Sequence, residues 1–344
     1  MITIGIDPHK SSVTAVAVDL AGYELGQIRL PVSKDLAEQL LGWAQAWPDR
    51  QWAVEGATGL GRGVAQLLAS ASQRVLDVPA KLAARARLLG SGSARKTDVT
   101  DAASVAAVAQ RNQRLRMVQA EDHTVILRLL SDHRDHLVAE RTRTLNRLHV
   151  LLRDLHPGGA KRDLSTIQAA ALLRLIRPLT PVDKQRKVLA RDLLADLRRL
   201  DTTIKAHTKS LTTALDTAGS TLTDVHGLGP VLAAKILAHS GDITRFPSRH
   251  HYASYCGTAP IEASSGDQRR HRLSRAGNRQ LNAAVHVIAV CQARDPGPGR
   301  NHYQRKLTES KTPAEARRSL KRQLSNVIYK RLLADHQRAL RSSA

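Results

Sequence analysis

The opening stretch Met1-Ile-Thr-Ile-Gly-Ile-Asp7-Pro-His-Lys10 decides the fold class of this chain. Its apolar residues from Ile2 to Ile6 predict a short buried strand, and Asp7 places a carboxylate at the end of that strand. A second apolar run, Trp52-Ala-Val-Glu55, ends in a carboxylate in the same way. Two acids at the ends of buried strands are the beginning of a cation-binding site, because hard cations prefer carboxylate oxygens.

The strand and helix patterns around this stretch follow a definite order. Three strands come first, then a helix and a fourth strand, then a second helix and a fifth strand. The expected strands cover residues 2–6, 12–20, 23–30, 51–54 and 75–78, and the expected helices cover residues 33–47 and 61–71. Ser33 is the expected N-cap of the first helix, and a loop is expected between residue 78 and the acids at 98 and 101. This is the order of the α/β RNase H-like fold, in which the carboxylates of the first and fourth strands lie side by side at the sheet centre and the last pair lies on the closing helix.

Asp98 and Asp101 complete the acidic set, within Lys96-Thr-Asp98-Val-Thr-Asp101. Their spacing places both carboxylates on one face at the start of a helix. Two divalent cations held by such a set stabilise both sides of a phosphoryl transfer. In the competing structural interpretation, Asp7 caps a turn, Asp98 is a helix N-cap, and Lys10 and Lys96 are only ion-pair partners. Four acids at these positions favour the metal site, with Lys10 and Lys96 beside it as nucleic-acid contacts.

The charge of the chain indicates its partner. Lys and Arg number 53 against 30 Asp and Glu, a formal charge of +23, which favours a polyanion such as DNA. A GC-rich genome, which enriches arginine, is the alternative explanation of this excess. Aromatic residues make up 3% of the chain, too few for the base-stacking platforms of single-strand binders.

Cysteine usage and hydropathy indicate the compartment. Two cysteines, Cys256 and Cys291, supply neither a disulfide framework nor a four-ligand metal site, which fits a reducing environment. The sequence contains no membrane-spanning stretch and no signal peptide pattern. The expected location is therefore the cytoplasm, in association with the nucleoid and not with a membrane.

The leucine spacing divides the rest of the chain, and three domains are expected at residues 1–110, 111–219 and 220–344. In the second domain, one leucine stripe runs from Leu127 to Leu155 and another from Leu189 to Leu211, which predicts two long helices. An antiparallel coiled coil and a packed helical bundle both fit this pattern, since the polar residues Arg134 and Arg141 interrupt the first stripe. In either arrangement the region is expected to assemble subunits, and the third domain is expected to be mainly helical.

Two motifs of the third domain suit contact with DNA. Gly227-Leu-Gly229, followed by small residues, resembles a helix-hairpin-helix turn, in which backbone N–H groups at Gly227 and Gly229 contact a phosphate. Such a turn also occurs for packing reasons alone.

Ser265 precedes Gly266 in a loop, where a serine is ordinarily a turn residue. Arginines surround it, and a hydroxyl beside a phosphate site is what a nucleophile attacking DNA requires. The residue types alone do not decide whether Ser265 is a turn residue or a nucleophile. The arginines expected to contact nucleic acid are Arg269, Arg270, Arg272, Arg275 and Arg279.

Taken together, these motifs resemble the DEDD-type transposases of insertion-sequence family 110, a group that also contains pilin-gene invertases. Gly5-Ile6-Asp7, Glu55-Gly-x-x-Gly and Lys96-Thr-Asp98-x-x-Asp101 are similar to the RuvC-like metal site of that family. Gly227-Leu-Gly229, Tyr255-Cys-Gly257-Thr-Ala-Pro260 and Ser265-Gly266 are similar to its C-terminal transposase domain. The resemblance covers nearly the whole chain in the same order.

This resemblance implies a recombinase that cuts and rejoins donor and target DNA. Asp7, Glu55, Asp98 and Asp101 would hold Mg²⁺, with Mn²⁺ as a substitute, and Ser265 would form a covalent phosphoserine link with DNA. Family members assemble as dimers or tetramers through the helical region, and are associated with a structured guide RNA from their own element. The adjacent Ser264 leaves the identity of the nucleophile open by one residue.

Two other functions use the same residues differently. A hydrolytic, structure-specific endonuclease would use the four acids with water as the nucleophile, and Ser265 would be structural. A basic nucleic-acid-binding or assembly protein would need none of the acids, and their placement argues against it.

Overall fold

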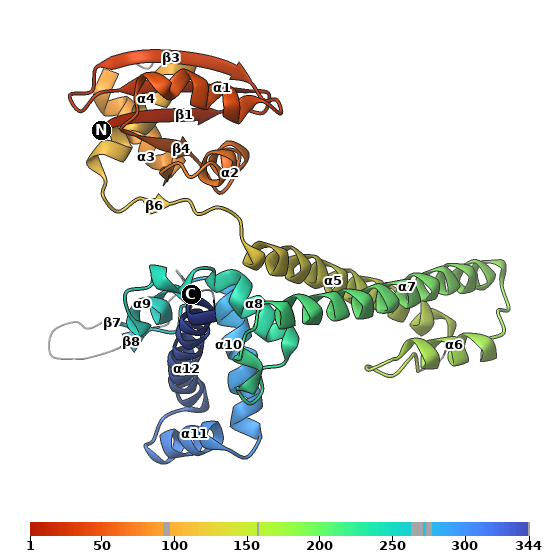
Figure 1. Ribbon diagram of the computed structural model, residues 1–344. Coiled ribbons are helices and arrows are strands. Elements are labelled where there is room, and N and C mark those ends of the chain that lie inside the picture. The colour runs from red at the N-terminus through yellow and green to blue at the C-terminus, as the bar shows by residue number, and fades with distance from the viewer. Residues whose placement is uncertain (92–96, 157, 263–270, 273–276, 343–344) are drawn as a thin grey trace. The chain divides into compact units, whose positions relative to one another are not determined.

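The computed structural model describes residues 1–91, 97–156, 158–262, 271–272 and 277–342. The chain forms two compact units, an N-terminal unit, Met1–Glu121, and a C-terminal unit, Asp122–Ala344. In the described residues the first unit is α/β, and the second is helical apart from a two-stranded ribbon (Figure 1). The further division into three functional domains, with boundaries at residues 110 and 219, stays a prediction.

A six-stranded sheet with the order β3-β2-β1-β4-β5-β6 forms the N-terminal unit. The first three strands are antiparallel, β4 runs parallel to β1, and β5 runs parallel to β4. The strands are β1 (Ile2–Pro8), β2 (Ser12–Val18), β3 (Glu24–Pro31), β4 (Arg50–Glu55), β5 (Val75–Val78) and β6 (Arg116–Met117). The first and fourth strands lie side by side in this sheet, as predicted, so the RNase H-like fold class is confirmed.

Alternation along the strands gives the sheet two buried faces with different partners. Ile4 and Ile6 of β1 point to the face that packs against α1 (Leu36–Trp43) and α2 (Arg62–Ser70). The opposite face packs against α4 (Asp98–Arg111), where Ala53 of β4 joins Val105 in one core cluster. Since side chains alternate, Gly5 and Asp7 of β1 share this second face with Ala53 and Glu55 of β4.

Two expectations for the helices of this unit are wrong. The first helix does not start at Ser33 but at Leu36, with Asp35 in the N-cap position and no side-chain capping hydrogen bond. The segment after β5, expected to be a loop, contains α3 (Ala80–Ser91). Leu82, Ala83 and Ala86 of this helix pack against the core, whereas Leu88 and Leu89 are exposed. Its apolar residues therefore do not form a single stripe in the sequence.

Two long helices, α5 (His123–Leu155) and α7 (Pro181–Thr217), pack side by side in the C-terminal unit (Figure 1). They are antiparallel, because Arg134 donates to Thr208 at 3.0 Å whereas Arg141, further along α5, pairs with Asp201. Thus both predicted polar residues of the leucine stripe contact the partner helix. A short helix, α6 (Thr166–Leu175), covers the distal half of the pair, so this end is a three-helix cluster rather than a bare coiled coil.

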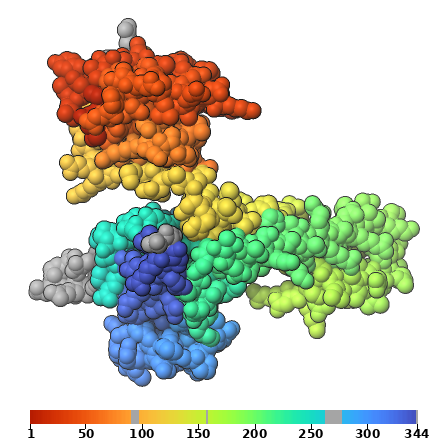
Figure 2. Space-filling view, viewed as in Figure 1, coloured from red at the N-terminus to blue at the C-terminus, as the bar shows by residue number. Residues whose placement is uncertain are grey.

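The proximal end of the helix pair belongs to the core of a helical lobe. Leu127 of α5 and Leu211 of α7 are fully buried in one cluster with Ile236, Val285 and Ile328. The lobe contains α8 (Pro230–Ser240), α9 (Arg249–Tyr255), β7 (Ile261–Glu262), β8 (His271–Arg272), α10 (Arg279–Arg294), α11 (Pro298–Thr308) and α12 (Pro313–Ser342). Figure 2 shows the pair and α6 extending away from this lobe. None of the described helices combines the length and hydrophobicity needed to cross a bilayer.

Candidate functional site

Asp7 and Glu55 lie at the ends of adjacent parallel strands. The register pairs Ile6 with Val54, and each carboxylate is the next residue on its strand. Both belong to the face covered by α4, because they alternate with Gly5 and Ala53. Asp7 is 7% exposed and Glu55 is half-buried. The sheet therefore holds two carboxylates at one level, on the same face, beneath one helix.

Close packing at Gly5 brings α4 onto this face. A Cβ atom on Gly5 would lie 2.0 Å from the carbonyl oxygen of Ala102 and 2.7 Å from the amide nitrogen of Ala106. Any side chain at this position would force the helix away from the strand. The absence of a side chain therefore allows the first turn of α4, which carries Asp98 and Asp101, to approach the end of β1.

Thr97, not Asp98, caps α4. The Thr97 hydroxyl accepts from the amide of Thr100, and the Thr100 hydroxyl accepts from the amide of Thr97 in return. The structural interpretation of Asp98 as the N-cap is therefore wrong, and its carboxylate is available for other partners. The partial positive charge at the start of the helix also favours two acids in its first turn.

His9 connects two of the predicted acids. Its Nε2 atom lies 3.2 Å from a carboxylate oxygen of Asp7 and 3.2 Å from one of Asp98. The three side chains offer ligand atoms that all lie within 4.8 Å of one another. His9 is not among the site residues predicted from the sequence, where it is marked only by its position two residues after a strand-terminal aspartate.

Two arginines complete the surroundings of the acidic cluster, defined as Asp7, Glu55, Asp98 and Asp101. Arg29 of β3 lies 3.0 Å from the second oxygen of Asp98, and Arg87 of α3 forms an ion pair with Asp101. Asp101 is 8% exposed, so its charge is poorly hydrated. Arginines from two separate elements therefore pair with the acids of the cluster, and His9 lies between Asp7 and Asp98.

The Gly227 turn lies at the start of α8, as expected. Gly227 has a positive φ of 77°, and Gly229 is the N-cap of α8. The element before the turn is a 3₁₀ turn, Leu222–Asp224, so only the second helix of a helix-hairpin-helix is of full length. A Cβ atom on Gly227 would lie 3.2 Å from the sulfur of Cys291, so the turn packs closely on α10.

His226, Cys291 and Asp295 form a second polar cluster beside this turn, which the sequence analysis missed. One oxygen of Asp295 accepts from the Cys291 thiol at 3.2 Å and lies 3.3 Å from His226 Nε2. Hydrogen bonds from Arg294 and then Cys291 lower the pKa of Asp295 to about 2, and the same bond with Asp295 raises the pKa of Cys291. The three groups offer ligand atoms within 4.8 Å of one another, so they could also hold a metal ion.

The remaining predicted contacts fall in different parts of the chain. Lys10 is exposed after β1, Arg279 is exposed at the start of α10, and Arg272 lies in β8. The others lie outside the described residues: Lys96, Ser264, Ser265, Arg269, Arg270 and Arg275.

Comparison with known proteins gives two family matches. A family of transposases, the DEDD type of IS110, matches residues 4–157. The transposase IS116/IS110/IS902 family matches residues 219–304. The first match contains the whole acidic cluster, and the second contains the Gly227 turn and residue 265.

Individual relatives extend this similarity along the chain. An uncharacterized 44.8 kDa protein of insertion element IS116 from Streptomyces clavuligerus is 28% identical, over 95% of this chain and 94% of the relative. An uncharacterized 43.6 kDa protein of insertion element IS110 from Streptomyces coelicolor is 32% identical, over 68% of this chain and 70% of the relative.

Among solved structures, RuvC of Thermus thermophilus is similar to this chain with 17% identity and a TM-score of 0.28. The similarity covers 34% of this chain and 100% of the RuvC chain. The fold assignment rests on the strand order and not on this similarity. The two family matches and the Streptomyces relatives, taken together, show that the chain belongs to the IS116/IS110/IS902 family of transposases.

Proposed function

We propose that this chain is a recombinase that cuts DNA and rejoins it through a covalent protein–DNA intermediate. Membership of a transposase family implies a DNA-cutting activity. The observation that carries the proposal is the convergence of Asp7, His9 and Asp98 at the end of β1, within the family-matched region. The net charge of +23 supports a nucleic-acid substrate, because a protein with this charge gains affinity by releasing counterions from phosphates.

The acidic cluster fits a divalent cation. Its donors are carboxylate oxygens, two of them on side chains that are at least nine-tenths buried, Asp7 and Asp101. In the structure, Arg29 and Arg87 supply positive charge beside Asp98 and Asp101, and His9 lies 3.2 Å from Asp7. Asp7, Glu55, Asp98 and Asp101 would hold Mg²⁺, or Mn²⁺ in its place, since both prefer oxygen ligands. When bound, the cation would neutralise charge that develops on the phosphate during its transfer.

Ser265 is the proposed nucleophile, with Ser264 as the adjacent candidate. Its Oγ would attack a DNA phosphorus, form an Oγ–P bond and break one P–O bond to deoxyribose, whose oxygen takes up a proton. A DNA hydroxyl would later attack the phosphoserine, form the new phosphodiester and return the proton to serine. The phosphate ester is conserved throughout, so rejoining requires no external energy source.

A structured RNA from the same element is the proposed guide for donor and target DNA, and the functional species is proposed to be a dimer or tetramer. Base pairing would then select the sequence, while basic side chains hold the backbone. The helix pair α5 and α7 supports an assembly role because it exposes Ile126, Leu129 and Val138 on its surface.

Hydrolytic cleavage is the second candidate, since the acidic cluster alone suffices for it. Water would replace Ser265 as the nucleophile, and both cut ends would remain free. Ser265→Ala separates the two functions, because it would abolish joining in a recombinase and spare cleavage in a hydrolytic nuclease.

The decisive experiment uses the full-length protein with its co-purified RNA, Mg²⁺ and labelled DNA that carries the element junction. After denaturation, DNA attached to protein would be isolated and the attached residue mapped by mass spectrometry. A phosphoserine adduct at residue 265 supports the recombinase. Free cut ends without any adduct would replace it with the hydrolytic nuclease.

A further inference from the structure

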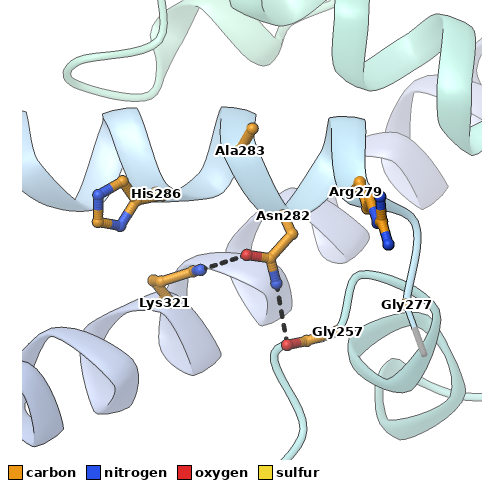
Figure 3. Close-up of a pocket in the computed structure, with 7 residues that line it drawn as sticks. All are labelled: Gly257, Gly277, Arg279, Asn282, Ala283, His286 and Lys321. Carbon is orange, nitrogen blue, oxygen red and sulfur yellow. Dashed lines mark hydrogen bonds between the residues drawn. The ribbon is translucent and has the colours of Figure 1, made fainter. Parts of the chain in front are cut away.

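A hollow of about 490 Å³ opens in the helical lobe between α10, α12 and the turn after α9. Figure 3 shows its lining, with Arg279, Asn282 and His286 on one face of α10 and Lys321 on α12. Gly257 and Gly277 contribute backbone. Among the described lining residues there is no acid, and Arg279 and Lys321 supply positive charge, with the imidazole of His286 beside them.

Asn282 has a fixed orientation at the centre of the hollow. Its Nδ2 group donates to the carbonyl oxygens of Cys256 at 2.9 Å and Gly257 at 3.0 Å. Its Oδ1 atom accepts from Lys321 Nζ at 2.7 Å (Figure 3). Only this orientation of the amide forms all three hydrogen bonds, because the two backbone carbonyls can only accept and the Lys321 ammonium can only donate. Asn282 therefore holds the Lys321 ammonium in one place.

Lys321 is a buried ammonium for which the described part of the chain supplies no ion-pair partner. It is 8% exposed, and its hydrogen-bond partner there is the neutral amide of Asn282. One of its three N–H groups is used by Asn282. A buried charge is costly unless it is paired. An anion in the hollow would supply the missing partner.

Lys187 shows what a buried lysine without such a role looks like. It is also 8% exposed, and its Nζ donates at 2.6 Å to the carbonyl of Ile176, the C-cap residue of α6. The C-terminus of a helix carries partial negative charge, which stabilises this ammonium. Lys321 instead has a neutral amide as its partner and lines an open hollow.

The hollow lies beside the two ends of residues 258–276, the segment of sequence that contains the proposed nucleophile. Gly257 and Gly277 stand on either side of residues 258–276 in the sequence and are in close contact. A Cβ atom on Gly277 would lie 2.3 Å from the amide nitrogen of Gly257, and the amide of Asn278 donates to the carbonyl of Tyr255 at 2.7 Å. Both ends of the segment are thus fastened at the wall of the hollow, next to Lys321.

We infer that this hollow binds a phosphate of the DNA backbone, with Lys321, Arg279 and His286 as its contacts and Asn282 as the positioning residue for Lys321. The inference rests on the proposed function, because it places the bound phosphate beside the segment that contains Ser265. Arginine and lysine with free N–H groups are the usual partners of phosphate oxygens.

The electrostatics of the hollow agree with this assignment. Burial lowers the pKa of Lys321, and burial followed by the charges of Lys321 and Arg317 lowers the pKa of His286. Burial therefore disfavours the positive forms of both side chains. A bound phosphate would raise both pKa values, since an opposite charge favours the charged form.

The test compares Lys321→Met with Lys187→Met, which removes an equally buried lysine elsewhere in the same unit. His286→Glu is the second variant, because His286 is exposed and the change places a negative charge at the rim without disturbing a buried group. Binding of a labelled junction duplex to the full-length protein would be measured between about 50 and 200 mM salt. The slope of log K against log salt is negative, and its magnitude should fall by about 0.9 in K321M, the value for one lost phosphate contact, and remain unchanged in K187M. H286E should weaken duplex binding, and adduct yield in K321M should fall on the order of a hundredfold.

Each outcome separates the two proposals. A wild-type slope, wild-type adduct yield and native fold in K321M would overturn the phosphate site. A changed slope for an RNA hairpin but not for the duplex would overturn the assignment to DNA. A changed duplex slope in K321M, with no adduct in the wild-type protein, would keep the phosphate site and refute the serine chemistry.

Discussion

Gly5 of β1 lies against Ala102 of α4 so closely that a methyl group on Gly5 would sit 2.0 Å from the Ala102 carbonyl oxygen. This contact sets the separation between the strand that ends in Asp7 and the helix that begins with Asp98. The geometry of the acidic cluster therefore depends on a residue with no functional group of its own.

Gly5→Ala should destabilise the N-terminal unit by about 1–3 kcal/mol, because α4 must shift to relieve the overlap. The same shift would separate Asp98 from Asp7 and lower DNA cleavage. Gly63→Ala in α2 is the matched control, since nothing lies within 4 Å of the added Cβ. It should stabilise α2 by roughly 0.5–1 kcal/mol. Denaturant unfolding of both variants measures the contrast, and equal effects would contradict this account.

Mg²⁺ should raise the unfolding temperature of the wild-type protein, because a ligand that binds only the folded state stabilises it by about 2.7 kcal/mol at 100 times its Kd. Asp7→Asn should remove this increase, since it deletes a predicted ligand. Asp77→Asn is the control. Asp77 accepts from the amide of Ala57 at 2.9 Å, and an asparagine oxygen can accept the same hydrogen bond, so D77N should weaken this bond only slightly and leave the Mg²⁺ effect in place. Calorimetry with and without Mg²⁺ distinguishes the two; an undiminished increase in D7N would exclude Asp7 as a ligand.

Leu127 and Leu129 are two positions apart on α5 and should respond differently to truncation. Leu127 is 0% exposed in the lobe core, whereas Leu129 is 64% exposed. Leu127→Ala should lower the free energy of unfolding by about 2–5 kcal/mol, because it leaves a cavity in the core. Leu129→Ala should change stability by less than about 0.5 kcal/mol in the monomer. Urea unfolding gives both values, and a large loss in L129A at low protein concentration would show that this surface is covered within the chain.

Asp295 should contribute to stability in a defined pH range. Hydrogen bonds, first from Arg294, lower its pKa in the folded state from 3.8 to about 2. The ionised carboxylate therefore favours folding above its unfolded pKa, and this contribution is lost as the pH falls through the folded value. The stability difference between wild type and Asp295→Asn should be largest near pH 5 and shrink towards pH 2, by amounts limited by solvent screening. Thermal unfolding across this range provides the measurement, and a difference that grows towards pH 2 would reverse the assignment.

The buried strands were predictable because their signal is local. β1 and β4 are short apolar runs that end in an acid, and β5 (Val75–Val78) has the predicted bounds. The start of α4 was also predictable, since Asp98 and Asp101 precede a run of small apolar residues. In contrast, α3 packs through Leu82, Ala83 and Ala86 while Leu88 and Leu89 are exposed, and β6 has only two residues, so neither produces a clear periodic pattern.

The contacts around the sites were not predictable in the same way. His9 contacts Asp98 only because α4 packs on Gly5, and nothing in the local sequence marks that approach. Lys321 reaches Asn282 across α12 and α10, 39 residues apart, through packing of the whole lobe. Helical periodicity indicates which residues are buried, but not which charged residue will lie in the core beside a particular turn.

The helix pair has a consequence for distance. With 33 residues in α5 and 37 in α7, each helix spans roughly 50–55 Å at 1.5 Å per residue. A length of this order equals about 15 base pairs of duplex at 3.4 Å per step. The helix pair therefore holds α6, at its distal end, at a fixed distance from the lobe that carries Lys321. Because Arg141 pairs with Asp201 across the two helices, this interval can change only if both helices are lengthened or shortened together.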